Sequence, residues 1–252
     1  MQIGLIGAGN MARGLALGWG RPLLCTDLDA ARARALAEEV GGEAVATNAE
    51  LAQRADLVVL CHKPPGLHAV AEEAAPHARA VVSILASVPL AEVRAAYPGR
   101  PVFRVMPSVP VALRQGVCVM AAGPPQDGQA EVEALFAELG ALVTVEDRLV
   151  DAAMGLMSCA PAYYALVAEA QVDAGVRHGL PPQQAAEMVA QTMLGSAALL
   201  QQLGHDSLAL RRSVTSPGGT TARGLDALER HGLRAAFSDA LDAVLQTGSH
   251  RS

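Results

Sequence analysis

Short apolar runs alternate with amphipathic stretches from Gln2 to Val145. We predict strands at Ile3–Ile6, Leu23–Thr26, Leu57–Leu60, Ala80–Leu85, Val102–Val105, Val117–Ala121 and Leu142–Val145. Stretches rich in Ala, Leu and Glu lie between the early strands, and helices are expected at Ala30–Val40 and Ala49–Arg54. Strands that alternate with helices in this way predict an α/β fold, with a mostly parallel sheet and helices on both faces.

The strand pattern ends after about Glu146. Helices are predicted at Asp147–His178, Gln183–Leu203, Thr221–Arg230 and Leu233–Gln246. Pro161 should kink or break the first of them. We therefore expect an α/β domain over residues 1–146 and an all-helical domain over residues 147–252. The wide apolar face of the second helix predicts packing against a second subunit.

The first predicted strand runs directly into a glycine-rich turn. The sequence there reads IGLIGAGNMA, and the residues in question are Gly7, Gly9, Asn10, Met11 and Ala12. The first glycine permits a tight turn, the second lets the backbone approach a pyrophosphate, and the alanine allows close packing of helix on strand. The helix that follows points its free amides at that phosphate. This arrangement predicts a Rossmann-like dinucleotide-binding domain.

Asp27 ends the second predicted strand, where an acid can accept hydrogen bonds from the ribose hydroxyls of a dinucleotide. Because a carboxylate repels a 2′-phosphate, Asp27 favours NADH over NADPH. Arg32 and Arg34 follow closely and argue the other way. As an alternative, Asp27 or Asp29 caps the next helix.

Two later strand ends also point to a cofactor cleft, because ligands of open α/β sheets bind at the carboxyl ends of the strands. Lys63 and Pro64 follow one strand, and Met106 and Pro107 follow another. Lys63 is equally compatible with a purely structural role.

A short stretch of small residues, SVTSPGGTTA, interrupts the helical half. Pro217 fixes the entry to a turn, and Gly218 and Gly219 permit a close ligand approach. Thr220 or Thr221 is expected to cap the helix that begins near Ala222. Backbone amides and hydroxyls at a helix start favour a site for a small carboxylate, although a plain linker is the alternative.

Composition excludes several classes of function. A net charge of −6 disfavours nucleic acid as a partner, because phosphate binding needs a basic surface. No uninterrupted apolar run approaches the roughly 20 residues of a membrane span, and the start of the chain does not resemble a signal peptide. No Cys/His spacing suggests a metal site. We expect a cytoplasmic protein without metal.

Taken together, the motifs resemble the Δ1-pyrroline-5-carboxylate reductase family. The similarity runs through IGLIGAGNMA (3–12), Lys63–Pro64, SILAS (83–87), RVMPSVP (104–110), PAYYALVAEAQVDAGVRHGLP (161–181), AAEMVAQTMLGSAALL (185–200) and LRRSVTSPGGTTARGLDALERHGLRAAF (210–237). The last segment is the most specific of these.

The resemblance implies hydride transfer from NADH or NADPH to C5 of a cyclic imino acid, which gives L-proline in the last step of its biosynthesis. It also implies an interlocked homodimer with the active site at the interface, and leaves open whether dimers assemble further. The amides of Gly218, Gly219 and Thr220 would bind the substrate carboxylate, within a substrate loop that also includes Ser216 and Pro217. The hydroxyl of Thr221 would bond to the ring nitrogen, which makes Thr221 the candidate catalytic residue.

The chain departs from the family pattern at four positions. Ser87, Cys159 and Ala160 stand where the family commonly has small residues that include glycine, and Ser108 stands where it has asparagine. The lost glycines could narrow the cleft or change the substrate.

Three other functions remain as alternatives. A β-hydroxyacid dehydrogenase needs a lysine in the helical domain, but the one lysine of this chain is Lys63. A non-catalytic NAD-binding regulator, or a reductase of another small imine or oxo acid, would tolerate the lost glycines. The intact SPGGTT segment argues against the regulator.

Overall fold

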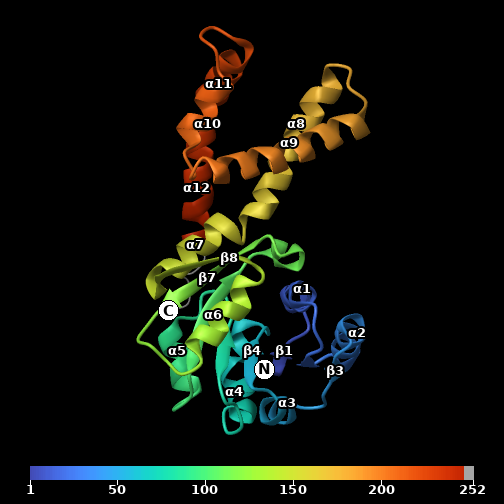
Figure 1. The fold of residues 1–252 in the computed structure, drawn as a ribbon, viewed down its shortest axis with the longest axis vertical. Helices are drawn as coiled ribbons and strands as arrows, with labels where there is room; N and C mark the ends of the chain where they lie inside the picture. The colour runs from blue at the N-terminus through green and yellow to red at the C-terminus, as the bar shows by residue number, and fades with distance from the viewer. Residues whose placement is uncertain (247–252) are drawn as a thin grey trace. The chain divides into compact units, whose positions relative to one another are not determined.

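The computed structural model describes residues 1–246 and divides the chain into two compact units (Figure 1). The first unit is Met1–Cys159 and the second begins at Ala160. The predicted domain boundary after residue 146 lies earlier in the chain, and the predicted domain end at residue 252 lies outside the described residues. We describe each unit by itself.

The first unit is built on one eight-stranded sheet in the order β3-β2-β1-β4-β5-β6-β7-β8. The strands are β1 (Ile3–Ile6), β2 (Leu24–Thr26), β3 (Glu43–Ala44), β4 (Leu57–Leu60), β5 (Val81–Ser83), β6 (Val102–Pro107), β7 (Gly116–Ala122) and β8 (Gly140–Glu146). All neighbouring pairs are parallel except β6 and β7, which are antiparallel. The predicted mostly parallel sheet is confirmed.

Helices cover both faces of this sheet, and a separate apolar core lies under each layer. The helices are α1 (Asn10–Trp19), α2 (Ala30–Val40), α3 (Asn48–Arg54), α4 (Leu67–Ala74), α5 (Leu90–Ala96), α6 (Gln129–Ala137) and α7 (Val150–Met157). Residues of α1, α2 and α6 form one core, where Trp19 packs edge-on against Phe136. Residues of α3, α4, α5 and α7 contribute to the other, which contains the buried Tyr97.

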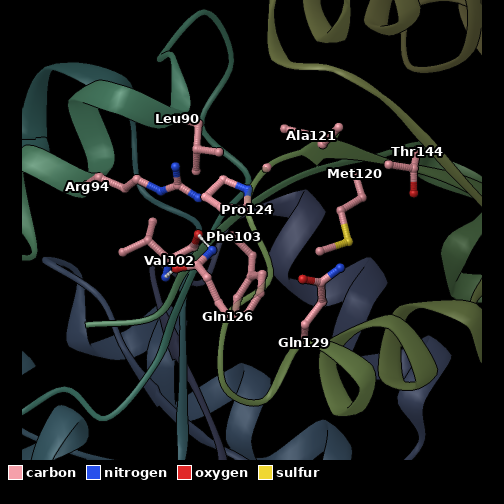
Figure 2. A pocket seen from close by; sticks show the side chains of 12 residues that line it. Leu90, Arg94, Val102, Phe103, Met120, Ala121, Pro124, Gln126, Gln129 and Thr144 are labelled. Atoms are coloured by element: carbon pink, nitrogen blue, oxygen red, sulfur yellow. Dashed lines mark hydrogen bonds between the residues drawn. The ribbon is translucent and has the colours of Figure 1, made fainter. Parts of the chain in front are cut away.

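The outer part of the sheet is tied to the chain before α6 through Gln126. Its amide oxygen accepts a hydrogen bond from the backbone nitrogen of Val102 at 2.9 Å, and its amide nitrogen donates to the Val102 carbonyl at 2.7 Å (Figure 2). Gln126 thus serves the first residue of β6 as a neighbouring strand would.

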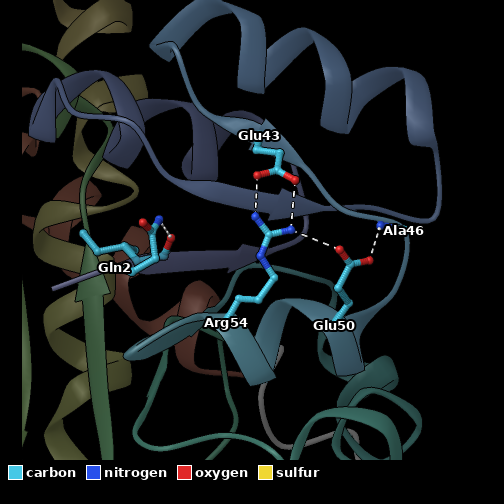
Figure 3. A network of polar contacts seen from close by, with 6 residues as sticks. Gln2, Glu43, Ala46, Glu50 and Arg54 are labelled. Atoms are coloured by element: carbon cyan, nitrogen blue, oxygen red, sulfur yellow. Dashed lines mark hydrogen bonds and ion pairs between the residues drawn. The ribbon is translucent and has the colours of Figure 1, made fainter.

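At the opposite edge, Arg54 of α3 pairs with Glu43 of β3 and with Glu50 one turn earlier in its own helix (Figure 3). Glu50 in turn accepts a hydrogen bond from the backbone of Ala46. These contacts secure β3, a two-residue strand absent from the sequence prediction. Because the residues are exposed, they contribute little to stability.

Arg104 of β6 makes the most deeply buried ion pair of the first unit. Its side chain is 2% exposed and donates to Asp147 at 2.9 Å and to Asp151 at 2.6 Å. Asp147 also accepts from the backbone nitrogen of Leu90. A buried cation is strongly destabilising once it loses its partners, so Arg104 anchors α7 to the sheet.

The second unit is entirely helical within its described residues. It contains α8 (Ala160–Arg177), α9 (Pro182–Gln202), α10 (Ser207–Ser213), α11 (Thr220–Arg230) and α12 (Leu233–Gln246). Helix α8 packs against α9, and α11 against α12. The predicted break near Pro161 is confirmed, because α7 ends at Met157 and α8 begins at Ala160.

This unit has almost no core of its own. Ala160 and Ala185 are its only buried residues in the described chain. Large apolar side chains are instead exposed along its helices, among them Tyr164, Leu166, Met188, Leu194, Leu228 and Phe237. Apolar surface on this scale indicates a protein–protein interface.

One helical run, Asp147–Arg177, is long and apolar enough to cross a membrane by length and composition alone. Its most apolar window has a mean hydropathy of 1.2 and is 17% buried. The run is interrupted between α7 and α8 and carries Glu169 and Asp173. A helix that docks on a second subunit has the same composition, so the run is weak evidence for a membrane span.

Candidate functional site

The glycine-rich turn after β1 has the geometry that the sequence predicted for Gly7. Its φ is +104°, and a Cβ there would lie 2.7 Å from the carbonyl carbon of Cys61 and from the nitrogen of His62. The Gly7 amide donates to the Thr26 carbonyl at 2.8 Å. Only glycine fits this position, because both the dihedral and the close backbone contact exclude a side chain.

Gly9 differs from Gly7, because a Cβ at Gly9 would meet nothing within 4 Å. Gly9 is the N-cap of α1, and no side chain caps that helix. Its first turn, at Asn10 and Met11, contains no acidic residue. The start of α1 therefore presents free amides and a partial positive charge to open space, as a pyrophosphate requires. Ala12 is buried against the sheet.

The Asp27 carboxylate connects β2 to the glycine-rich turn. One oxygen accepts from the Ala8 amide at 2.7 Å and the other accepts from the Asp29 amide at 2.8 Å. Asp29, not Asp27, caps α2 by accepting from Ala31. Each Asp27 oxygen still has a lone pair for a ribose hydroxyl. The open alternative is thereby resolved: the helix cap is Asp29.

The chain after β4 lies beside Gly7. Lys63 is exposed and precedes the short 3-10 helix η1 (Pro64–Gly66). His62, which the sequence did not mark as a candidate, has a buried Nε2 atom without a hydrogen-bond partner in the described residues. Burial lowers the pKa of His62, opposed by its contact with the Lys63 carbonyl. Burial also raises the pKa of the Cys61 thiol, so a neutral pair flanks the turn.

The end of β6 is buried more deeply than expected of ligand-contacting residues. Met106 is 4% exposed and belongs to the core, and Pro107 is also buried. Ser108 is 2% exposed, and its hydroxyl accepts from the Val117 amide at 2.8 Å. Ser108 therefore links the start of β7 to the end of β6, a structural role for the serine that replaces the family's asparagine.

The remaining departures from the family pattern have different consequences. Ser87 has a φ of +57°, a conformation that favours glycine, so the serine is strained there. Among the described residues, positive φ at a non-glycine occurs only at Ser87, Arg114 and His205. Cys159 and Ala160 are not among them, and replacing glycine at these two positions requires no left-handed backbone.

The loop Thr215–Thr221, which we call the substrate loop, is exposed for most of its length. Gly218 has a φ of +69°, and Gly219 leaves room for Ser216, whose hydroxyl oxygen would lie 2.4 Å from a Cβ at that position. The turn therefore favours glycine at 218 because of its backbone conformation, and at 219 because a side chain there would displace the Ser216 hydroxyl. Pro217 precedes them and is exposed.

The structure contradicts a threonine cap for the helix after this loop, and it shows which amides of the loop are hydrogen-bonded. Helix α11 begins at Thr220 with Gly219 as its N-cap, and neither Thr220 nor Thr221 caps it. The Gly219 amide is not free, because it donates to the Ser216 carbonyl at 3.0 Å. The first hydrogen bond of the helix comes from Arg223, so the orphan amides are those of Thr220, Thr221 and Ala222. These orphan amides lie further along the chain than the Gly218, Gly219 and Thr220 amides that the resemblance implied.

Residues 1–246 contain no group of three or more His, Cys, Asp or Glu side chains that could hold a metal ion.

Comparison with family models gives two matches. Residues 147–250 match the model for pyrroline-5-carboxylate reductase dimerisation. Residues 2–87 match the model for NADP oxidoreductase, coenzyme F420-dependent. The first match covers the helices whose apolar side chains are exposed.

Individual relatives extend the similarity over nearly the whole chain. The pyrroline-5-carboxylate reductase of Pseudomonas aeruginosa is 35% identical and aligns with 97% of this chain and 94% of its own length. That of Thermus thermophilus is 33% identical, with 98% and 97% covered.

Solved structures agree. The 1-pyrroline-5-carboxylate reductase of Streptococcus pyogenes matches with a TM-score of 0.88 and 29% identity over 98% of each chain. The Plasmodium falciparum pyrroline carboxylate reductase, solved with NADP bound, shares the fold with a TM-score of 0.86 and 23% identity over 98% of this chain and 97% of its own. With more than 30% identity to relatives along nearly its full length, the chain belongs to the pyrroline-5-carboxylate reductase family.

Proposed function

We propose that the protein reduces Δ1-pyrroline-5-carboxylate to L-proline. The observation that carries this proposal is the full-length similarity to reductases of that name, together with the glycine geometry of both the turn after β1 and the substrate loop. In the reaction, the C5=N bond becomes a single bond, with a hydride added at C5 and a proton held on nitrogen.

The turn after β1 fits a nicotinamide dinucleotide. The open space at Gly9 and the uncapped start of α1 would hold the pyrophosphate. Bound there, the reduced nicotinamide would supply the hydride. The exposed Lys63 and the half-buried Pro64 follow β4 at the same edge of the sheet, and the buried Met106 and Pro107 would contribute through their backbone.

We favour NADH over NADPH because of Asp27. Its carboxylate is held by two backbone amides where the ribose hydroxyls would lie, and a carboxylate there would repel a 2′-phosphate. The Nε atom of Arg32 lies 3.6 Å from a carboxylate oxygen of Asp29, and this ion pair opposes a turn of Arg32 toward the ribose. Arg34 is exposed. An arginine that turned toward the ribose would favour NADPH instead.

The substrate loop would bind the imino acid. The orphan amides of Thr220, Thr221 and Ala222 suit a carboxylate, and the α11 dipole adds to the attraction. The exposed Thr221 hydroxyl would then orient the ring nitrogen. Catalysis in this scheme is mainly positioning, because none of these loop residues is a strong acid or base.

We further propose that the protein is a cytoplasmic homodimer. In each chain, the boundary between the cofactor-binding and the substrate-binding domain would fall after residue 146 of the sequence. The dimerisation match and the exposed helices support self-association. In this proposal the substrate loop of one subunit completes the cofactor site of its partner.

The test follows the oxidation of NADH and NADPH separately with pyrroline-5-carboxylate as the acceptor. We expect turnover with both cofactors and a higher kcat/KM with NADH. A preference for NADPH would overturn the role given to Asp27 and leave the reaction standing. Cofactor binding without turnover would contradict the reductase function.

Three substitutions of one residue make the same assay more specific. Thr221→Val removes the hydroxyl at nearly constant volume and should lower kcat about tenfold to a hundredfold, as expected for a hydrogen bond to a charged group. Thr221→Ser keeps the hydroxyl and should restore most of kcat, whereas Thr221→Ala should not. Cofactor affinity, measured by fluorescence, should be unchanged in all three.

A further inference from the structure

A small pocket lies in the first unit near the beginning of β6. It has a volume of about 100 Å³ and lies between α5, α6, the first residues of β6 and the last residues of β7 (Figure 2). Leu90, Val102, Phe103 and Met120 provide its apolar lining, and Arg94 provides its charge. The glycine-rich turn follows the other, carboxyl end of the parallel strands, so this pocket is separate from the proposed cofactor site.

Arg94 stands out because its guanidinium takes part in none of the ion pairs found among residues 1–246. Its Nη2 atom is buried and has no hydrogen-bond partner among the residues that the structure describes. The side chain extends from α5 into the pocket, toward Pro124 (Figure 2). A buried cationic donor left unpaired is destabilising, so Nη2 of Arg94 favours a ligand that brings an acceptor oxygen.

No hydrogen bond joins Nη2 of Arg94 to the polar groups that line the pocket. Gln126 uses both of its amide atoms on Val102. The Gln129 amide nitrogen donates to Glu133. Asp147, which contacts the Leu90 amide, is already paired with Arg104. The pocket thus combines one uncompensated positive charge with apolar walls.

Size and chemistry together define the ligand. A dry cavity of about 150 Å³ can hold benzene, with six non-hydrogen atoms, so about 100 Å³ suits a ligand of roughly four such atoms. A short carboxylate has an anionic end for the guanidinium and an apolar end for Leu90 and Met120. We propose that this pocket is a second anion site, which binds a small carboxylate through Arg94.

Acetate is the probe, and its binding is measured as the rise in Tm at constant ionic strength, with chloride as the balancing anion. Arg94→Gln should weaken the apparent acetate affinity at least about tenfold, because it removes a charge-assisted hydrogen bond. The matched control is Arg100→Gln, which removes the same charge from an exposed residue outside this pocket. It should leave acetate binding unchanged.

Gly123→Ala provides a second variant that keeps the charge. A Cβ at Gly123 would lie 2.9 Å from Nη2 of Arg94, so the added methyl group should crowd the guanidinium and weaken acetate binding as well. Acetate bound only at the substrate loop would give the same Tm response in the native protein and in both pocket variants. That result, or a loss smaller than tenfold in Arg94→Gln, would overturn the proposal and leave the reductase function untouched.

Discussion

The glycine-rich turn after β1 and the substrate loop use glycine in similar ways but have different surroundings. Gly7 is enclosed by the backbone of Cys61 and His62, and Asp27 fixes the next amide. In the substrate loop, a Cβ at Gly218 would meet nothing within 4 Å, and one at Gly219 would meet only Ser216 of the same loop.

Within one chain, backbone atoms therefore enclose the glycine-rich turn, whereas the substrate loop is an exposed segment that no other part of the described chain encloses. The same difference separates the two units, since the first has two apolar cores and the second has almost none. The comparison teaches that an enclosed turn and an exposed loop coexist in this chain, and that the exposed loop lies within the region of the dimerisation match.

The largest effect is expected from Gly7→Ala, which breaks the enclosed turn. The added Cβ meets backbone atoms at 2.7 Å and the residue must keep a φ of +104°, so the variant should lose about 2–5 kcal/mol of unfolding free energy. Urea unfolding at two protein concentrations measures it. Gly9→Ala is the control: it should weaken NADH binding and change stability by less than about 0.5 kcal/mol. Equal stabilities of the two variants would contradict this account.

An intermediate effect is expected from a change on the exposed apolar surface of the helices that match the dimerisation model. Leu194 of α9 is 56% exposed, and Leu194→Asp should weaken dimerisation at least about a hundredfold, because symmetry repeats the loss in both subunits. Sedimentation and the concentration dependence of turnover measure it. Leu113→Asp, at an exposed leucine outside the dimerisation match, should not alter the assembly. A monomeric native protein with full activity would refute the comparison.

The smallest effect concerns backbone strain at Ser87, which follows β5. Ser87→Gly should raise the unfolding free energy by about 0.5 kcal/mol, since relief of the left-handed strain exceeds the added chain entropy. Ser87→Ala keeps the strain at the φ of +57° and should not stabilise. Thermal unfolding of the three proteins side by side checks the sign. Stabilisation by alanine would show that backbone strain is not the cause.

Local patterns predicted the parts of the fold that depend on local interactions. Helix Ala30–Val40 and strand Ile3–Ile6 have the predicted bounds, because periodicity and flanking turns define them. Strand β3 was missed because Glu43–Ala44 is too short to form a pattern, and α10 was missed because its seven residues, Ser207–Ser213, carry little periodicity.

The sequence could not indicate contacts between distant residues. Arg104 and its carboxylates are 43 and 47 positions apart, and nothing in their neighbourhoods marks them as partners. The unpaired Arg94 and the buried His62 Nε2 also depend on packing. The composition of the substrate loop was enough to predict the loop. Which of its amides are free could not be predicted, because this depends on the turn, in which the Gly219 amide donates to the Ser216 carbonyl.

The exposed apolar helices also affect the newly made chain. Translation completes the first unit, with both of its cores, before the helices after Ala160 have left the ribosome. Those helices then emerge with apolar side chains that remain exposed to water until a second subunit binds. Such exposure favours aggregation when the concentration of the second subunit is low. The yield of folded protein should therefore depend on how quickly newly made subunits associate. Neighbouring ribosomes on one messenger RNA would bring such subunits close together.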